Sequence, residues 1–394
     1  MTSTTMTAAG ARSALDLDRL AFGLLLAFVG AVQISIAPAQ ILLAMLLVCW
    51  AVLAARAGGR PQAPRFFLPL LVYAGWTLVA TLFSFNWMVS LADDKQLLLF
   101  LIVPAVYHIA RGERAQTVVN VIISVGAVIG AYGIIQYGIL QYDSLGRRPT
   151  GTLTHYMTYS GVVMLVICAA TARLVFGSRD RTWPALVMPA LVVALALTFT
   201  RSAWVGACVA VGLLLVLRDV RLGAVLPVLV ALMFAVAPDR INARMVSMFD
   251  LQDPTSRDRV AMARTGAAII RAQPITGVGP DMVPRVYAEF RDASAVQETN
   301  PHLHNVPLQI AAERGLPALA AWAWFAVALG AGLWRRFREG GDRTLPAGGL
   351  AALAAMLAAG LFEHNFGDSE FLMLFLVLVT LPFAAARAGA RGAA

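Results

Sequence analysis

Long, almost uninterrupted apolar segments constrain this chain most. Examples are Leu20–Ile36, Gln96–Ala110 and Leu372–Ala386. A segment of about 20 apolar residues crosses the hydrocarbon core of a bilayer as a helix, because a helix satisfies its own backbone polar groups. Hydrophobic residues make up 59% of the 394 residues and charged residues only 13%, roughly half the charged share of a soluble protein. The sequence therefore predicts an all-α polytopic membrane protein, because a soluble all-α protein could not bury so much apolar surface.

Hydropathy and turn signals divide the chain into about 12 transmembrane helices. The expected spans are 20–36, 39–55, 66–85, 96–110, 116–140, 157–176, 184–200, 202–217, 222–237, 310–334, 346–362 and 370–387. The spans 184–200 and 202–217 meet almost directly at Thr200–Arg201, so we expect a tight turn there.

Basic residues concentrate in alternate connections between these spans. One side receives Arg12, Arg19, Arg56, Arg60, Arg65, Arg111, Arg114, Arg173, Arg179, Arg181, Arg218, Arg221, Arg335, Arg336, Arg338, Arg343, Arg387 and Arg391. The other side receives only Lys95, Arg147, Arg148 and Arg201, with Arg314 near the start of a span. By the positive-inside rule both termini are expected in the cytoplasm, and the net charge of +9 does not indicate a nucleic-acid partner.

One long connection divides the chain into three parts. Residues 1–237 hold nine spans behind a polar cytoplasmic tail (residues 1–18), residues 238–305 form a loop on the outer side, and residues 306–394 hold three spans. Loops of this length are functional or disordered, and helix-forming stretches favour a folded loop. We expect a helix over about 257–272, with Thr255 or Ser256 as N-cap, ending before Gln273-Pro274.

The loop carries eight arginines and eight acidic residues, so any anion must be bound by particular arginines. Arginine suits phosphate because its planar fork makes two hydrogen bonds. Arg257, Arg264 and Arg271 recur every seven residues and share one helix face, whereas Arg259 is turned about 200° from Arg257. The alternative is a solvated helical loop held by salt bridges.

Arg201 stands between two apolar spans at the outer face, where an ionisable residue indicates function. The alternative is an interfacial arginine that reaches lipid phosphate.

The segment Pro301-His302-Leu303-His304-Asn305 precedes the span 310–334 and holds two of the five histidines. Histidine can transfer protons near neutral pH, although an ordinary interfacial histidine is the alternative. A metal site would need a third ligand. No metal-binding motif accompanies the pair, so we expect neither a metal nor a cofactor.

Two further outer segments are polar. The segment 144–159 contains Arg147, Arg148 and several hydroxyl residues that could face sugar or phosphate, or could simply form a Gly/Pro-punctuated loop. The segment 363–370 could supply a carboxylate, or could be polar only because tight turns are polar.

Four short motifs resemble those of bacterial O-antigen ligases. His304-Asn305 followed after nine residues by Gly315 resembles a His-Asn-x9-Gly motif, although Ala318 stands where the family has a further small or hydroxyl residue. The other three are Thr200-Arg201-Ser202-Ala203-Trp204, Ser256-Arg257-Asp258-Arg259 with Pro274-Ile275-Thr276-Gly277-Val278-Gly279, and Arg148-Pro149-Thr150-Gly151-Thr152. They occur in order on one expected membrane face, and with the span count the resemblance covers most of the chain.

The resemblance implies a GT-C-like, metal-independent, inverting glycosyltransferase in a bacterial inner membrane, with its active site facing the periplasm. The donor would be O-antigen on undecaprenyl diphosphate and the acceptor a sugar hydroxyl of lipid A-core, within surrounding membrane lipids. His304, Arg201 and Arg259 would be catalytic, with His304 as general base or diphosphate ligand. The residues expected to bind substrate are Arg264, Arg257, Arg147, Arg148, His302 and Asn305.

Other functions stay open at this point. O-antigen polymerases and protein O-oligosaccharyltransferases belong to the same superfamily and share its topology. From other classes, a transporter of lipid-linked glycan would favour broken spans paired between two halves, and a non-catalytic assembly partner would not need arginines and histidine on one face. The sequence does not fix the sugars, the glycan length or the oligomeric state.

Overall fold

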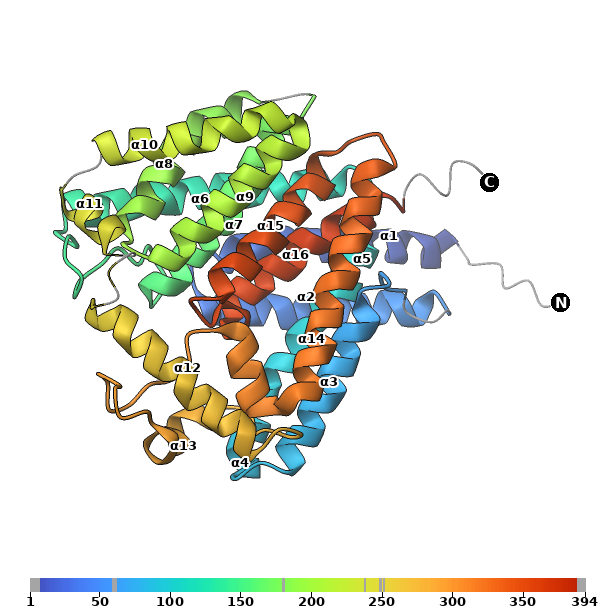
Figure 1. Ribbon diagram of the computed structural model, residues 1–394. Coiled ribbons are helices and arrows are strands. Elements are labelled where there is room, and N and C mark those ends of the chain that lie inside the picture. The colour runs from blue at the N-terminus through green and yellow to red at the C-terminus, as the bar shows by residue number, and fades with distance from the viewer. Residues whose placement is uncertain are drawn as a thin grey trace.

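The computed structural model describes residues 8–58, 62–178, 181–236, 239–247, 250 and 252–387 (Figure 1). Throughout these residues the regular structure is helical, with no strand. The orientation arginines Arg60, Arg179 and Arg391 lie outside the described residues, as do residues 1–7 of the expected tail and the boundary at residues 237–238.

The helices before the long connection are α1 (Ala8–Ala31), α2 (Ile36–Arg56), α3 (Phe67–Leu82), α4 (Trp87–Asp93), η1 (Asp94–Leu101), α5 (Ile102–Ile109), α6 (Arg114–Gly138), α7 (Tyr156–Phe176), α8 (Thr182–Leu197), α9 (Arg201–Arg218), η2 (Val220–Ala224) and α10 (Val225–Val236). The connection forms α11 (Asp239–Val246), α12 (Pro254–Ala272) and α13 (Val283–Phe290). The last part forms α14 (Val306–Arg338), α15 (Thr344–Gly360), η3 (Asn365–Gly367) and α16 (Ser369–Ala385).

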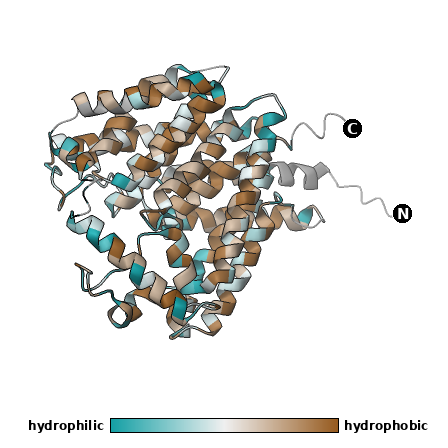
Figure 2. Cartoon of the chain, viewed as in Figure 1, coloured by the Kyte–Doolittle hydropathy of each residue, from teal (hydrophilic) through white to brown (hydrophobic). Residues whose placement is uncertain are grey.

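Hydrophobic residues predominate along the helices of the bundle (Figure 2). Many of their side chains are buried, and many other large apolar side chains are exposed on the surface. Among the described residues, α2, α6, α7, α9 and α14 are long and apolar enough to cross a membrane, and α3, α8, α15 and α16 are shorter apolar helices. In α7, 78% of the most apolar stretch is buried inside the protein, against 22% in α2. Helix α7 is therefore central, and the exposed apolar face of α2 is suited to lipid. The expectation of an all-α polytopic membrane protein is confirmed.

Every segment expected to span the membrane is largely helical in its described part, but two are not single α-helices. The segment 96–110 is divided between η1 and α5, and the segment 222–237 between η2 and α10. Helix α1 begins at Ala8, inside the segment expected to be a polar tail.

Polar contacts link residues from the first and last helices to their neighbours on one side of the bundle, here called the terminal face. Asp18, near the middle of α1, pairs with Arg111 and Arg114, which precede and begin α6, at 3.4 and 2.6 Å. Arg387, beyond α16, donates to the Tyr107 carbonyl of α5 at 3.2 Å and to Gln62 at 2.9 Å. The first half of α1 and the end of α16 lie on the same side of the bundle (Figure 1).

The opposite side, here called the connection face, carries the long connection. Helix α12 begins at Pro254, earlier than expected, and its N-cap is Asp253 rather than Thr255 or Ser256. The Asp253 carboxylate accepts hydrogen bonds from the backbone N–H groups of Thr255 at 3.0 Å and Ser256 at 3.2 Å. An aspartate cap followed by proline at the first helical position is a strong helix start, which explains the shift.

The connection docks on α14 through backbone hydrogen bonds at a kink. The N–H groups of Val278 and Gly279 donate to the carbonyls of Ala312 at 3.0 Å and Glu313 at 2.9 Å, and Leu316 donates to Pro274 at 2.9 Å. At the kink, Gly315 has φ 79° and ψ 171°, a region that is essentially restricted to glycine. A Cβ atom there would lie 1.9 Å from the Ile275 carbonyl oxygen. The glycines of two sequence motifs therefore meet at one joint, which permits close approach of two backbones.

Candidate functional site

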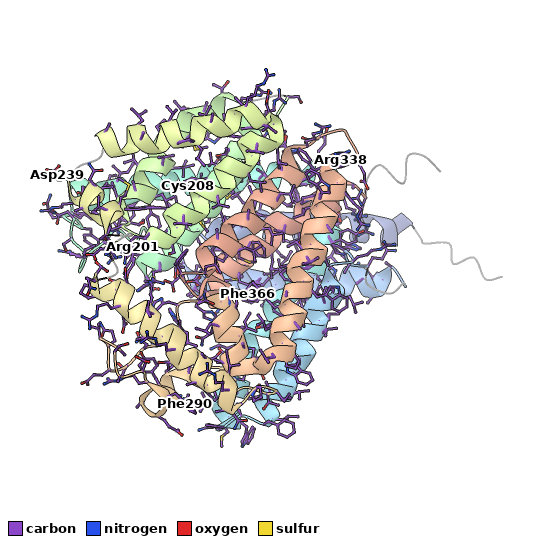
Figure 3. All side chains as sticks on the ribbon, in the orientation of Figure 1. Arg201, Cys208, Asp239, Phe290, Arg338 and Phe366 are labelled. Atoms are coloured by element: carbon purple, nitrogen blue, oxygen red, sulfur yellow. The ribbon has the colours of Figure 1, made fainter. Side chains whose placement is uncertain are left out.

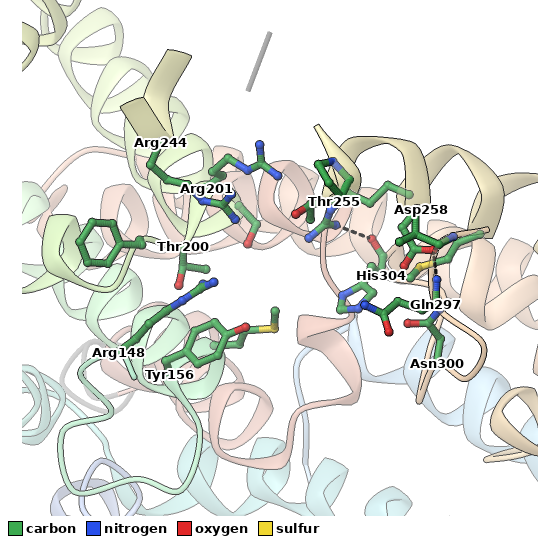
Figure 4. A pocket seen from close by; sticks show the side chains of 17 residues that line it. Arg148, Tyr156, Thr200, Arg201, Arg244, Thr255, Asp258, Gln297, Asn300 and His304 are labelled. Carbon is green, nitrogen blue, oxygen red and sulfur yellow. Dashed lines mark hydrogen bonds between the residues drawn. The ribbon is translucent and has the colours of Figure 1, made fainter. Parts of the chain in front are cut away.

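A cavity of about 290 Å³ opens on the connection face, between α12 and the first turns of α7 and α9 (Figure 4). We call it the arginine cavity, because four arginines line it: Arg148, Arg201, Arg244 and Arg259. Asp258 is the one acidic residue in its described lining. Its carboxylate accepts hydrogen bonds from the N–H groups of Val296 and Gln297 at 3.0 and 3.1 Å. The cavity is therefore strongly cationic and suited to an anion.

Arg201 is the first residue of α9, directly after the tight turn expected at Thr200–Arg201 (Figure 3). Its guanidinium donates to the Ser247 carbonyl at 2.9 Å and pairs with Asp253 at 3.4 Å. Thr200 makes no side-chain cap bond. The free N–H groups of this helix start add a further positive potential to the cavity.

Arg259 and Arg244 approach the cavity from α12 and α11. Burial lowers the pKa of Arg259. The positive charge of Arg201 lowers it further, and the negative charge of Glu363 partly offsets this shift. Burial together with Arg201 and Arg148 lowers the pKa of Arg244 to about 10, and its Nε atom is buried without a hydrogen-bond partner in the described part of the chain. These cations repel one another, so a bound polyanion would relieve the repulsion.

Arg148 completes the cationic wall from the loop that precedes α7. Its guanidinium stacks on the Tyr156 ring at 4.2 Å from the ring centroid and donates from Nε to the Leu145 carbonyl at 2.9 Å. Stacking fixes the plane of the guanidinium while its remaining N–H groups stay available to a ligand.

His304 lines the arginine cavity from the start of α14 and is hydrogen-bonded to Glu363, in the α15–α16 connection. The His304 Nδ1 atom lies 3.0 and 3.1 Å from the two Glu363 carboxylate oxygens. Burial alone would raise the pKa of Glu363, but the His304 hydrogen bond and the charges of the two histidines and Arg259 lower it to about 2. An ionised carboxylate can only accept, so Nδ1–H is the donor, and in the neutral imidazole Nε2 then carries the lone pair. This pair, the His304–Glu363 dyad, has the geometry of a general base held by a carboxylate.

The backbone also sets the position of His304. Its φ angle is +49°, in the left-handed region that non-glycine residues rarely adopt. The Arg259 guanidinium donates to the His304 carbonyl at 3.5 Å (Figure 4). The histidine is therefore in contact with one of the four arginines of the cavity.

His302 packs edge-on against His304, with ring centroids 4.1 Å apart, and its Nε2 atom lies 3.6 Å from Glu363. The candidate ligand atoms of His302, His304 and Glu363 all lie within 4.8 Å of one another. The sequence showed no third ligand beside the two histidines, but the fold supplies one in Glu363. These three residues could hold a metal ion.

The structure does not bring every expected residue to the arginine cavity. Arg257 and Arg264 are exposed on the other face of α12, where Arg264 pairs with Asp292 at 3.7 Å. Arg147 is exposed and stacks on Tyr142 at 4.2 Å. Asn305 is the N-cap of α14, accepting from the Leu308 N–H at 2.9 Å and donating to the Leu361 carbonyl at 3.0 Å, so its amide is already engaged by the protein.

Sequence reasoning did not select two residues that the structure places at the site. Arg244 was only one of many loop arginines, and no local spacing distinguishes it. Glu363 was part of a polar turn that could supply a carboxylate. Its position on the same expected membrane face as His304 was the available signal.

Fold and site together define a multi-pass helical membrane protein with an anion-binding cavity beside a histidine–carboxylate dyad. The model of the O-Antigen ligase family matches residues 185–323. This match, over about a third of the chain, supports membership of the O-antigen ligase superfamily, whose members are glycosyltransferase-like enzymes, and it does not distinguish ligase from polymerase. The matched region contains Arg201, Arg259 and His304. No curated protein matches the chain.

Proposed function

We propose that this protein transfers O-antigen polysaccharide from undecaprenyl diphosphate to a sugar hydroxyl of lipid A-core, on the periplasmic face of the bacterial inner membrane. The observation that carries the proposal is the arginine cavity beside the His304–Glu363 dyad, within a chain of the O-antigen ligase superfamily. The arginine cavity suits a diphosphate, and the dyad suits the activation of a hydroxyl.

The proposed reaction is a direct displacement. The acceptor oxygen forms a bond to the anomeric carbon of the donor sugar while the bond from that carbon to the diphosphate oxygen breaks. The diphosphate leaves with the bonding electron pair, and the acceptor proton passes to Nε2 of His304. Attack opposite the leaving group inverts the anomeric carbon, so the product linkage has the opposite configuration.

The arginines would stabilise the charge that develops on the leaving group. Arg201 and Arg259 would hold the diphosphate, with Arg148 and Arg244 completing the wall. Donors of this kind are worth about 10²–10³-fold each in rate. Because four fixed cations are present, the proposed mechanism needs no metal for charge stabilisation.

The glycan transfer would be catalysed by His304 as general base, with Glu363 holding its tautomer and stabilising the imidazolium that forms. A positioned general base contributes about 10²–10⁴-fold. His302 would support the dyad by packing against the His304 ring.

A transfer assay with purified protein tests this function. The reaction contains undecaprenyl-diphosphate-linked O-antigen, lipid A-core and EDTA, and the product is lipopolysaccharide that migrates more slowly in a gel. We expect product with wild-type protein and at least about 10²-fold less with His304→Ala. Wild-type rates from His304→Ala would contradict the role of the base, and loss of activity in EDTA that Zn²⁺ restores would contradict the metal-independent mechanism.

The same assay separates the alternatives. Lengthened lipid-linked glycan without a core-linked product would indicate a polymerase. Absence of both products from folded protein would contradict the ligase and the polymerase. It would leave a protein O-oligosaccharyltransferase, whose protein acceptor this assay lacks, or a transporter.

A matched pair of variants on α12 tests the diphosphate site. We expect Arg259→Ala to weaken binding of undecaprenyl diphosphate by about tenfold or more, because it removes a charged hydrogen bond. Arg271→Ala removes an exposed arginine from the same helix, so it should bind like wild type. Equal affinities for the two variants would place the diphosphate elsewhere.

A further inference from the structure

A second cavity of about 250 Å³ lies on the connection face, next to the arginine cavity. The start of α7, the residues before α14 and the α15–α16 connection line it. Its polar lining residues are His155, Thr158, His302, Glu363, His364, Asn365 and Asp368. Met157 lines both cavities, and the two members of the dyad divide between them, with His304 lining the first and Glu363 the second. The hydrogen bond of the dyad therefore connects the two cavities.

The electrostatic character of this second cavity is opposite to that of the first. Its described lining contains two carboxylates and no arginine or lysine. A phosphate group would meet these carboxylates with no arginine or lysine beside them in the described lining, so this cavity disfavours the donor diphosphate.

The hydrogen-bonding groups present are those that suit hydroxyl groups. Carboxylates accept from hydroxyls, and a neutral imidazole both donates and accepts. The Nδ1 atoms of His302 and His364 are buried and have no hydrogen-bond partner among the described residues. Buried polar atoms are normally paired, and both side chains line this cavity, so a bound hydroxyl group is a candidate partner.

We infer that this second cavity binds the acceptor sugar, so that donor and acceptor occupy separate cavities joined by the dyad. The inference rests on the proposed function. At about 250 Å³ the cavity is below the range of roughly 300–1,000 Å³ typical of drug-sized ligands, and it suits one uncharged sugar ring rather than a polysaccharide. The ring would be held by Asp368 and the histidines, with the reacting hydroxyl directed past Met157 to His304.

Asp368 allows a variant that keeps the fold. Its Oδ1 atom caps α16 by accepting from the Phe371 N–H at 3.0 Å, and its other oxygen accepts from the Thr158 hydroxyl. Asparagine caps a helix as well as aspartate does, so Asp368→Asn retains the cap and replaces the carboxylate oxygen that would accept from a sugar hydroxyl with an NH₂ group. The matched control is Asp219→Asn, at another aspartate N-cap, which precedes η2 and accepts from the Arg221 N–H at 2.9 Å.

The experiment measures KM for lipid A-core and for the lipid-linked donor separately in purified protein. We expect Asp368→Asn to raise the acceptor KM about tenfold while the donor KM and the binding of undecaprenyl diphosphate stay at wild-type values. Asp219→Asn should change none of these. An unchanged acceptor KM in Asp368→Asn, or a rise confined to the donor KM, overturns the assignment.

A second measurement on wild-type protein does not depend on any variant. Lipid A-core that carries a photoreactive group on its terminal sugar is crosslinked, and the labelled peptides are identified by mass spectrometry. Labels within residues 155–161 and 361–371 support the acceptor cavity, whereas labels within 254–262 of α12 overturn it. If wild-type protein makes no core-linked product at all, the proposed function itself fails, which is a different result from active protein with labels in the wrong cavity.

Discussion

His304 and Glu363 are 59 residues apart in the chain, yet one hydrogen bond determines what the histidine can do. With Nδ1–H donated to an ionised carboxylate, only Nε2 is free to accept a proton from a hydroxyl. The role of the dyad thus depends on the charge of Glu363 as well as on its position.

Glu363→Gln tests that dependence. The amide can present an N–H to Nδ1, which would favour the wrong tautomer and remove the charge that stabilises an imidazolium. We expect kcat to fall about 10²–10⁴-fold with little change in the donor KM, measured in the transfer assay. Glu289→Gln is the same chemical change at an exposed position on α13 and should retain wild-type kcat. If the two variants behave alike, the dyad is not catalytic.

At the scale of elements, the joint between the connection and the kinked α14 positions the residues of the site relative to one another. Helix α14 carries His304 just before its start, and the backbone bonds at Ala312 and Glu313 hold the connection that includes α12. Arg314 strengthens this joint by pairing with Glu313 at 2.7 Å and with Asp93 of α4 at 3.0 Å.

Gly315→Ala should disrupt this joint. The alanine would need a φ/ψ region that costs of order 1–3 kcal/mol, and its Cβ would overlap the Ile275 carbonyl. We expect a lower Tm in detergent and loss of transfer activity. Gly330→Ala in the same helix places its Cβ 3.3 Å from the flexible Leu353 side chain. The Tm of this variant should therefore be close to that of the wild type. Full activity and an unchanged Tm for Gly315→Ala would mean that the joint does not position the site.

The elements themselves could be predicted because apolar length and turn residues are local signals. Helical periodicity likewise separated Arg259 from Arg257 and Arg264, which the structure places on different faces of α12. The sequence could not show which face docks, because that choice depends on α14 and on the loop that Asp258 holds. Nor could it pair His304 with Glu363, since that contact arises where the start of α14 meets the α15–α16 connection.

At the scale of the whole molecule, the structure separates a terminal face from a connection face. Contacts of Asp18 and Arg387 define the first, and the two cavities define the second. The positive-inside rule then predicts which face meets the cytoplasm.

Cysteine labelling tests this orientation. All three native cysteines, Cys49, Cys168 and Cys208, are free thiols within helices and can be replaced by alanine. In intact cells a membrane-impermeant maleimide should label Ser144→Cys, on the connection face, but should label Glu339→Cys, on the terminal face, only after permeabilisation. The reverse pattern would place the cavities in the cytoplasm and contradict a periplasmic active site.

The dyad also governs how this protein can be recombined with its relatives. The region that matches the O-Antigen ligase family, residues 185–323, includes His304 but ends before Glu363, and it begins after Arg148. A chimera that places only this segment in a relative would carry three of the four cavity arginines and His304 from this protein. The carboxylate that pairs with His304 and the loop that holds the fourth arginine would then come from the relative. Exchange units that preserve the chemistry must therefore carry the α6–α7 loop and α14 to α16 together, so the smallest transferable unit is set by packing and extends beyond the recognisable motif.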